Sequence, residues 1–416
     1  MSSASPNIGN AATLRRDRTH FFLLNVGHYL DHLFTLIFAT VAAVALKSEW
    51  GLGYAELLVY ATPGFFAFGV FALPAGWLAD KWSREGMMAV FFVGIGLASI
   101  LTSLARTPRE MGIALFVLGV FAAIYHPVGL AIVTERWKNT GMRLAVNGVW
   151  GNLGVGSAAL ITGYFIDHGG WRTAFVLPGI VSIAFGIIYG AVFWPEIAHG
   201  AGRAKVAPAQ TPAMTPDHRA MLWRISIIVF VTTAVSSIIF QSTTFALPKV
   251  FDERLRGLTS SATGLGQLAF LVFAAASVGQ LIVGHYLDRF GPRIVFMTVA
   301  ALQVLFFWTM PGLIDGPALA CALGFMLAAF GQIPINDYMI GRMAQGDLRA
   351  RIYGLRYVVS FSVLAATLPL IQFVYSNWGF DALFRILAVA AAVILATASQ
   401  LPARLPAPIT ANPLPA

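Results

Sequence analysis

Residues 76–85 read GWLADKWSRE and residues 284–293 read GHYLDRFGPR, so a glycine, an aspartate and a basic residue recur at the same spacing. The second stretch begins 208 residues after the first, which is half of the 416-residue chain. Other landmarks lie 207 or 208 residues apart in the same way: Arg143 and Arg351, Pro127 and Pro334, Trp171 and Trp378. Recurrence at one fixed offset predicts that the chain contains a duplicated unit.

The composition places this repeat in a membrane. Hydrophobic residues make up 58% of the chain and charged residues only 11%, with a mean hydropathy of +0.75. A soluble domain carries about 25% charged residues, so this chain has too few charges to cover a surface that faces water. The run from Met87 to Ala98 contains no polar side chain, whereas strands of a membrane barrel alternate polar and apolar residues. We therefore predict an all-α integral membrane protein.

Apolar segments of the length needed to cross a bilayer follow one another along the whole chain. The predicted spans are 20–46, 54–79, 86–105, 110–134, 143–166, 172–194, 222–247, 261–287, 293–312, 316–341, 352–375 and 380–402. Twelve spans place both termini on one side of the membrane. With the repeat, they predict two pseudo-symmetric bundles of six helices.

The segment between the two bundles has a different composition. Residues 195–221 hold four prolines, small residues and several charges, which is typical of a connecting segment. We therefore expect bundles over 1–194 and 222–402, a cytoplasmic linker over 195–221 and a disordered tail over 403–416.

The basic residues predict an orientation. Of the 27 lysines and arginines, 19 fall on the side that holds the termini, Arg356 among them, and 8 fall on the other side. Such a bias over short loops predicts cytoplasmic termini in a multi-pass protein of the bacterial inner membrane. The net charge of +9 is then an orientation signal, so we expect no nucleic-acid partner.

The repeated stretches resemble a signature of the major facilitator superfamily, which joins the second and third helices of each bundle. The first copy departs from it at Ser83 and Glu85. The resemblance implies that family's fold of twelve transmembrane helices. It also implies a gating latch at the cytoplasmic face, formed by Gly76, Asp80, Lys81, Arg84, Gly284, Asp288, Arg289 and Arg293. The alternative is that both aspartates only shape tight turns.

One predicted helix carries an unusual polar stripe. At about 100° per residue, its side chains fall within an arc of about 120°. The stripe consists of Asn25, His28, Asp31, His32 and Thr35. Titratable groups within a span are costly and face a cavity or a partner. We predict Asp31 as a proton site tuned by His28 and His32; the alternative is that Asp31 and a histidine only join two helices.

Polar residues on three further helices predict a substrate cavity. Tyr125 and His126 precede Pro127, which favours a kink, and this segment is similar to the fosmidomycin-resistance branch of efflux proteins. The superfamily resemblance implies that helices 1, 4, 7 and 10 line the cavity. Its predicted members are Asn25, Thr35, Tyr125, His126, Ser237, Gln241, Gln332 and Asn336. Small polar residues also join helices, which is the alternative for each. We expect Asp337 to pair with Arg342 as a gate or structural contact.

These observations predict a secondary active transporter rather than an enzyme. It moves a small organic substrate by alternating access, with proton-coupled export as the first hypothesis. The alternatives are a proton-coupled importer of an organic anion and a membrane sensor without transport. The sequence shows no phosphate-binding loop, so we expect no cofactor beyond the proton gradient. His28, His32 and Asp31 also match zinc-ligand spacing, but we expect no metal. We expect a monomer whose partners are its substrate and the lipid bilayer.

Overall fold

The computed structural model describes residues 8–137, 140–200, 216–343 and 346–402, and within these ranges the regular structure is entirely helical. The predicted linker 195–221 falls largely outside the described residues, and the predicted tail 403–416 falls wholly outside them. The helices are α1 (Ile8–Val44), α2 (Leu46–Trp50), α3 (Tyr54–Lys81), α4 (Arg84–Ser103), α5 (Pro108–Ala122), α6 (Tyr125–Arg136), α7 (Thr140–Gly169), α8 (Thr173–Val192), α9 (Trp194–Ala198), α10 (Pro216–Arg254), α11 (Ala262–Thr309), α12 (Asp315–Gly331), α13 (Ile333–Met343) and α14 (Gly346–Ser399).

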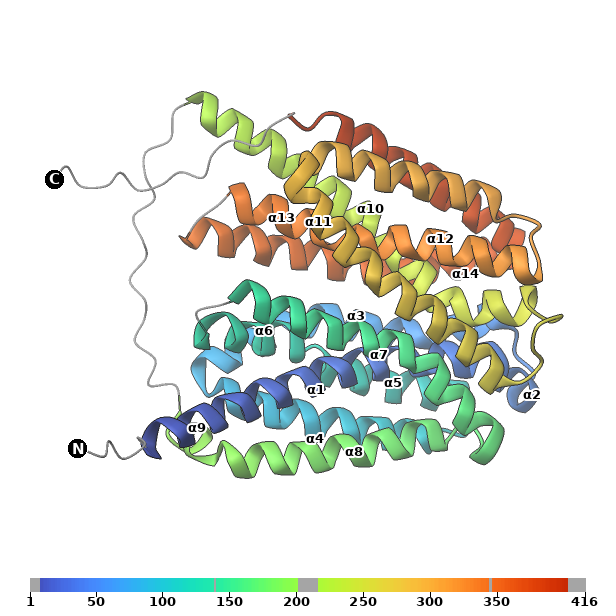
Figure 1. Ribbon diagram of the computed structural model, residues 1–416. Helices are drawn as coiled ribbons and strands as arrows, with labels where there is room; N and C mark the ends of the chain where they lie inside the picture. The colour runs from blue at the N-terminus through green and yellow to red at the C-terminus, as the bar shows by residue number, and fades with distance from the viewer. Residues whose placement is uncertain (1–7, 138–139, 201–215, 344–345, 403–416) are drawn as a thin grey trace, which may run out of the picture.

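Ten helical segments of the described chain are long and apolar enough to cross a membrane. Two of the helices, α11 and α14, have 48 and 54 residues and contain a non-helical glycine, Gly291 and Gly379. At about 1.5 Å per residue, each is long enough for two crossings of a core about 30 Å thick. In Figure 1 both helices reverse direction along the colour gradient. The count of twelve spans itself stays a prediction.

Local sequence signals explain where several helices begin. Ser83 accepts a hydrogen bond from the backbone N–H of Gly86 at the start of α4, and Ser261 accepts one from Gly264 at the start of α11. Thr107 caps α5 in the same way and is followed by Pro108. A side-chain oxygen at this position satisfies a backbone donor that the first helical turn leaves free.

Two predicted helices are interrupted just ahead of a proline. One helix is interrupted between α5 and α6, close to Pro127. Another is interrupted between α12 and α13 at Gln332, close to Pro334. Proline has no N–H and its ring crowds the carbonyl four residues earlier, so regular helix is disfavoured there. The predicted kink at Pro127 therefore has its counterpart in the other half of the chain.

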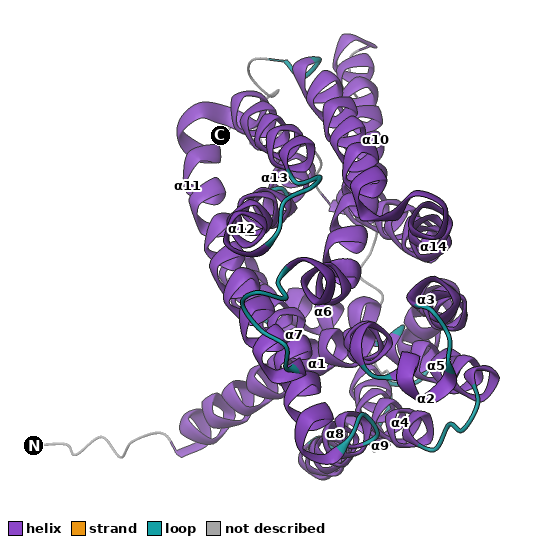
Figure 2. Ribbon diagram, turned by 90° about the vertical axis from the view of Figure 1, so that its right-hand side faces the viewer, coloured by secondary structure: helices purple, strands orange, loops and turns teal. Residues whose placement is uncertain are grey.

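The helices form two groups, α1–α9 (the N-terminal half) and α10–α14 (the C-terminal half), which Figure 2 shows nearly end-on. One hydrogen bond appears in both halves. Arg16 donates to the carbonyl of Val192 at 3.2 Å, and Arg224 donates to the carbonyl of Gln400 at 2.8 Å. The two arginines and the two carbonyls are each 208 residues apart, as the sequence repeat is. The first and last long helices of each half are thus joined by equivalent contacts.

The two halves contact each other through α7 with α11, α3 with α14 and α1 with α10. We call the end where α2 lies the α2 end and the opposite end, where α9 lies, the α9 end (Figure 1). At the α2 end the backbones of α7 and α11 approach closely. A Cβ atom added to Gly163 would lie only 2.2 Å from the carbonyl oxygen of Ala262. α1 begins and α14 finishes at the α9 end, as an even number of crossings requires.

Candidate functional site

The candidate site is built around Asp31, which lies on α1 and is fully buried. Its Oδ2 lies 3.4 Å from Nε2 of His126, a residue in the first turn of α6, just after the break before Pro127. The interruption between α5 and α6 therefore sets the position of the imidazole. The structure brings together a carboxylate and an imidazole that are 95 residues apart in the sequence.

Two more histidines surround this contact. The rings of His28 and His32 lie 5.3 and 5.5 Å from that of His126 between centroids, and 5.0 Å from each other. Nδ1 of His28 lies 2.8 Å from the carbonyl oxygen of Asn147, so Nδ1 carries the proton and donates it. The ring also stacks on Tyr125 at 4.8 Å. His28 is therefore held in one orientation with Nε2 directed away from Asn147.

The three imidazoles form a candidate group of metal ligands. One nitrogen from each of His28, His32 and His126 lies within 4.8 Å of the others. Tetrahedral zinc with Zn–N distances of about 2.0–2.1 Å holds its nitrogens about 3.3 Å apart. The separation of up to 4.8 Å is wider than that, so the rings would have to converge before they held an ion. Asp31, the third ligand of the zinc alternative, is not a member of this trio.

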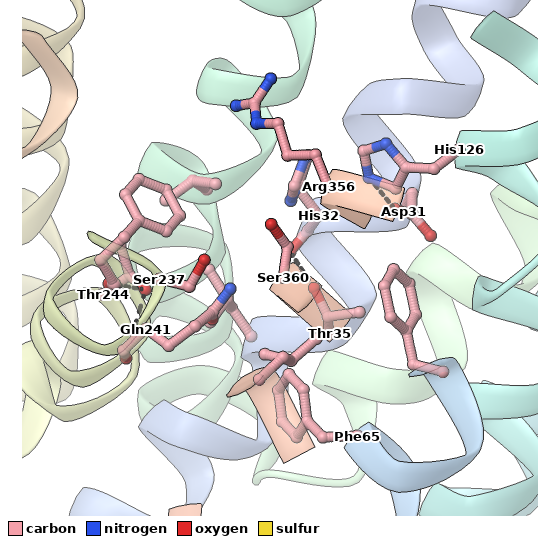
Figure 3. Close-up of a pocket in the computed structure, with 15 residues that line it drawn as sticks. Asp31, His32, Thr35, Phe65, His126, Ser237, Gln241, Thr244, Arg356 and Ser360 are labelled. Atoms are coloured by element: carbon pink, nitrogen blue, oxygen red, sulfur yellow. Dashed lines mark hydrogen bonds and ion pairs between the residues drawn. The ribbon is translucent and has the colours of Figure 1, made fainter. Parts of the chain in front are cut away.

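A cavity of about 180 Å³ opens beside Asp31, between the two halves (Figure 3). Predicted site residues on its wall come from α1, α6 and α10, and they face one another across it. They are Asp31, His32, Thr35, His126, Ser237 and Gln241. The remaining wall is formed by Leu36, Phe65, Phe68, Val155, Phe240, Thr244, Arg356, Ser360 and Leu364. The cavity therefore has a titratable side on the N-terminal half and a largely neutral side on the C-terminal half.

Two predicted cavity residues of the N-terminal half are placed away from this wall. Asn147 on α7 donates through Nδ2 to Asn25 Oδ1 and to the Tyr125 hydroxyl, both at 2.9 Å. The Tyr125 hydroxyl donates in turn to the carbonyl of Leu24 at 2.9 Å. Asn25 and Tyr125 are buried in a network that joins α1, α6 and α7. Their hydrogen-bonding groups are used between helices, which is the alternative given for them above.

Two predicted cavity residues of the C-terminal half are used in the same manner. Gln303 on α11 donates to Gln332 Oε1 at 2.6 Å, and Gln332 donates to the hydroxyl of Ser236. Thr232 donates to Asn336 Oδ1 at 3.2 Å. Neither Gln332 nor Asn336 lines the cavity, because their amides join α10, α11 and the α12–α13 break. The side chains of Asp337 and Arg342 lie outside the described residues.

Arg356 is the charged residue of the cavity wall that the sequence analysis did not predict. It was counted among the basic residues of the connections, yet it lies within α14 and lines the cavity one turn before Ser360. A signal was present, because Arg356 falls inside the predicted span 352–375, where an arginine is costly unless it faces a cavity or a partner. The aromatic wall of Phe65, Phe68 and Phe240 had no signal of its own among 32 phenylalanines.

The first predicted gating stretch forms a compact ionic cluster at the α9 end. Arg84 donates to Oδ1 of Asp80 at 3.1 and 2.8 Å and pairs with Glu135 at the end of α6. Asp80 is 63% exposed, and Lys81 is exposed as well. A Cβ added to Gly76 would lie 3.4 Å from Cβ of Pro127, so this glycine faces α6. The cluster connects α3, α4 and α6 within one half.

The second stretch differs in its turn. Gly291 has φ of 76°, a left-handed conformation that favours glycine, whereas Ser83 at the matching position has an extended backbone and caps α4. The departure at Ser83 thus replaces a turn residue by a cap. A Cβ added to Gly284 would meet open space. Asp288 and Arg289 are exposed, and Arg293 is half-buried.

A sequence model of the Major Facilitator Superfamily matches residues 24–266 and 229–415 of this chain. The chain belongs to the major facilitator superfamily. Membership places it among transporters rather than enzymes, and confirms the superfamily resemblance and the predicted all-α membrane fold.

Among curated proteins, this superfamily member is 22% identical to a gallate transporter of Pseudomonas putida, over 62% of this chain and 63% of that protein. It is 31% identical to a probable actinorhodin transporter of Streptomyces coelicolor, over 40% of this chain and 29% of that protein. The chain thus spans less than two thirds of either relative. The crystal structure of a D-xylose–proton symporter has the same fold, with a TM-score of 0.69 at 13% identity over 92% of this chain and 97% of that one.

Proposed function

We propose that this superfamily member is a proton-coupled secondary transporter that exports a small organic compound by alternating access. The observation that carries the proposal is the contact between the buried carboxylate of Asp31 and Nε2 of His126 on the wall of the cavity. A buried carboxylate is stable only when it is protonated or paired. The pair can therefore hold one proton, and that proton is reached from the cavity.

Proton binding and substrate binding would share this cavity, which gives a physical basis for coupling. Because Asp31 and His126 both line the wall, a substrate that enters replaces water around the pair and changes the stability of its charged form. In export, a proton taken from one side would be released as substrate binds from the other. His32, on the same wall, and His28, next to the pair, contribute to one coupled set.

The contacts at the α2 end support alternating access. Asp167, at the end of α7, accepts hydrogen bonds from the backbone N–H groups of Ala262 and Thr263 at 3.3 and 2.7 Å, and from the Thr263 hydroxyl at 2.5 Å. These bonds join the two halves. Opening at the α2 end must break them, so they favour the state in which the cavity is reached from the α9 end. Repeats that rock about a central site are a transporter design.

The orientation and setting are part of the same proposal. The bias of lysine and arginine supports cytoplasmic termini and a bacterial inner membrane, which would make the α9 end cytoplasmic. We propose a monomer in which the predicted latch at the α9 end favours one access state, with Asp80 and Arg84 fixing the shape of its first copy within the N-terminal half.

A second candidate is import of an organic anion together with protons. Arg356 on the cavity wall favours it, because a cation there attracts a carboxylate. The similarity to a protein named as a gallate transporter agrees with it, since gallate is an aromatic carboxylate. Export is supported by the resemblance of residues 123–127 to the fosmidomycin-resistance branch.

The sign of the pH gradient separates the two candidates. Purified protein in liposomes is given an acidic lumen or an acidic exterior, with radiolabelled fosmidomycin and gallate as probes. Accumulation driven by an acidic lumen indicates exchange of substrate for protons. Accumulation driven by an acidic exterior indicates co-transport.

Asp31→Asn should reduce gradient-driven accumulation to the level of empty liposomes. Asp315→Asn is the matched control, because Asp315 is a carboxylate that accepts a hydrogen bond from Gly257 within the C-terminal half, away from the cavity. Wild-type accumulation by Asp31→Asn would remove Asp31 as the proton site. If neither probe accumulates under either gradient, the alternative of a membrane sensor is favoured.

A further inference from the structure

The charged groups of the cavity are divided unevenly between the halves. Among its lining residues, the N-terminal half contributes Asp31, His32 and His126, and the C-terminal half contributes one charged residue, Arg356. Figure 3 shows the guanidinium of Arg356 at the same side of the cavity as His32 and Asp31, with Ser360 on the same helix. Because the guanidinium is always protonated, this part of the wall carries a permanent positive charge.

The scaffold does not require a cation at this position. With the repeat offset of 208 residues, which also relates Arg143 to Arg351, the counterpart of Arg356 in the N-terminal half is Gly148. A Cβ added to Gly148 would meet open space. The same helix of the fold thus has no side chain in one half and an arginine in the other. The arginine thus distinguishes the C-terminal half from the N-terminal half at this position, and it places a cation on the cavity wall.

The acid that lines the cavity, Asp31, already has a partner. Asp31 lies within 3.4 Å of His126, on the face of α1 that contacts α6. A guanidinium has five N–H donors in a planar fork, so Arg356 can keep a contact with the protein and still bind an anion through two parallel hydrogen bonds. A small anion that enters the cavity therefore meets a suitable donor set.

The rest of the wall limits the chemistry of the ligand. Phe65, Phe68 and Phe240 supply aromatic faces, and Gln241 and Ser360 supply neutral hydrogen-bonding groups. A molecule with an apolar or aromatic body and one charged end therefore matches the chemistry of this wall.

We propose that Arg356 is the anion-binding residue of the transport site, and that the substrate class is small organic anions with an apolar or aromatic body. The carboxylate, sulfonate or phosphate group pairs with Arg356, while the body packs against Phe65, Phe68 and Phe240. This inference rests on the proposed transport function, because it assigns the ligand of the same cavity. It adds a specificity-determining residue to a site otherwise defined by Asp31 and His126.

The test is equilibrium binding to the purified full chain, which needs no pH gradient and so is independent of proton coupling. The probes are gallate, benzenesulfonate and phenyl phosphate at millimolar concentration, with 3,4,5-trihydroxybenzamide as the neutral analogue of gallate. Binding is measured as a shift in thermal stability and by calorimetry. At least one anion should bind, and the neutral amide should bind at least tenfold more weakly than its acid.

Arg356→Gln should weaken anion binding at least tenfold, and Arg356→Lys should restore part of it because the charge returns without the planar fork. Binding of the neutral amide should stay the same in all three proteins, a result that a general loss of folding would not give. Arg385→Gln is the matched control, because Arg385 lies on the same helix and is exposed.

Unchanged anion affinity in Arg356→Gln would overturn the proposal, as would the absence of binding by all three anions to the wild-type protein. The proposed proton coupling has a separate test, which is gradient-driven accumulation by Asp31→Asn in liposomes. If the protein binds anions through Arg356 but does not respond to a pH gradient, the role of Arg356 is supported and the proposed proton coupling is not.

Discussion

The two halves of the protein share a scaffold but differ in chemistry where they face each other. With the offset of 208 residues for α1 and α10, Asp31 and His32 correspond to Ile239 and Phe240. With the offset of 207 that relates Pro127 to Pro334, His126 corresponds to Ile333. Asp31, His32 and His126 therefore have apolar counterparts, and His28 corresponds to a serine, Ser236. Duplication has preserved the helices and several of their contacts, while among the residues that line the cavity the carboxylate and imidazole groups come from the N-terminal half.

The buried networks next to these positions show the same contrast. His28 stacks on Tyr125 in the N-terminal half, and their counterparts, Ser236 and Gln332, are joined by a hydrogen bond in the C-terminal half. His28 also lies 5.3 Å from His126, the partner of Asp31, whereas the amide and the hydroxyl of the second network carry no ionisable group. Variants of the first network should therefore alter the pH dependence of transport, and variants of the second should alter stability at every pH.

The largest expected effect is that of His126→Gln. It removes the imidazole that contacts Asp31 and leaves a neutral amide in a similar volume. Gradient-driven accumulation in liposomes should fall to the level of empty liposomes, because the carboxylate loses the group with which it exchanges a proton. His168→Gln, at an exposed histidine near the end of α7, should transport normally. A wild-type pH profile in His126→Gln would remove the chemical distinction between the halves.

The next effect is that of Gln332→Leu on the neutral network. The change leaves the Gln303 amide and the Ser236 hydroxyl without this partner. Hydrogen bonds between membrane helices contribute about 0.6 kcal/mol on average and up to about 1.7 kcal/mol, so we expect a loss of about 1–2 kcal/mol. Unfolding in detergent should show the same loss at about pH 5 and about pH 8. Thr298→Val, at an exposed hydroxyl of α11, is the control; a loss confined to one pH would contradict the contrast.

A smaller effect is expected where the halves meet. Asp167→Ala removes the acceptor for the backbone N–H groups at the start of α11, and loss of such a cap costs about 1 kcal/mol. That free energy corresponds to an about fivefold increase in the population of molecules whose two halves are separated at the α2 end. Spin labels at Arg109→Cys and Arg256→Cys, in a Cys321→Ser background, would report the separation.

The control for this measurement is Asp252→Ala, because Asp252 pairs with Lys249 inside the C-terminal half. It should leave the distance distribution unchanged. If Asp167→Ala also leaves it unchanged, the bonds to α11 do not hold the α2 end closed.

The smallest effect concerns Glu49, which lies in α2 outside the spans. Partial burial raises the pKa of Glu49, but hydrogen bonds from Arg172 and Trp171 outweigh it, so the pKa lies below its usual value. Its stabilisation is therefore complete above about pH 4.3 and is lost as the pH falls through the lowered pKa. Glu49→Gln should cost less than about 1 kcal/mol near neutral pH and nothing in strong acid. Unfolding at a series of pH values measures this; a difference that persists in acid would contradict it.

The fold was predictable because membrane helices, the repeat and its turns leave local signals in the sequence. The site was predictable in part. The stripe on α1 correctly gathered polar residues on one arc, but an angle around the axis does not tell a neighbouring helix from a cavity. Asn25 faces Asn147, whereas Asp31 and Thr35 line the wall. Depth along the helix separates them, and that depends on where α7 packs.

For Arg356, the sequence signal pointed away from the cavity rather than towards it. A charge near the end of a span is usually a sign of membrane orientation, so it was assigned to a connection. Only the packing of α14 against the other half places it on the cavity wall. The two roles have the same sequence signal and differ in tertiary structure alone.

The pairing of first and last helices has a mechanical consequence. At the α9 end, Arg16 and Arg224 bond to the carbonyls of Val192 and Gln400. At the α2 end, Arg172 pairs with Glu49, and Arg254 with Asp381. Each half thus has contacts between its helices at both the α9 end and the α2 end. Because the first and last helices of each half are joined at two levels, these contacts favour movement of each half as a unit over bending of a single helix.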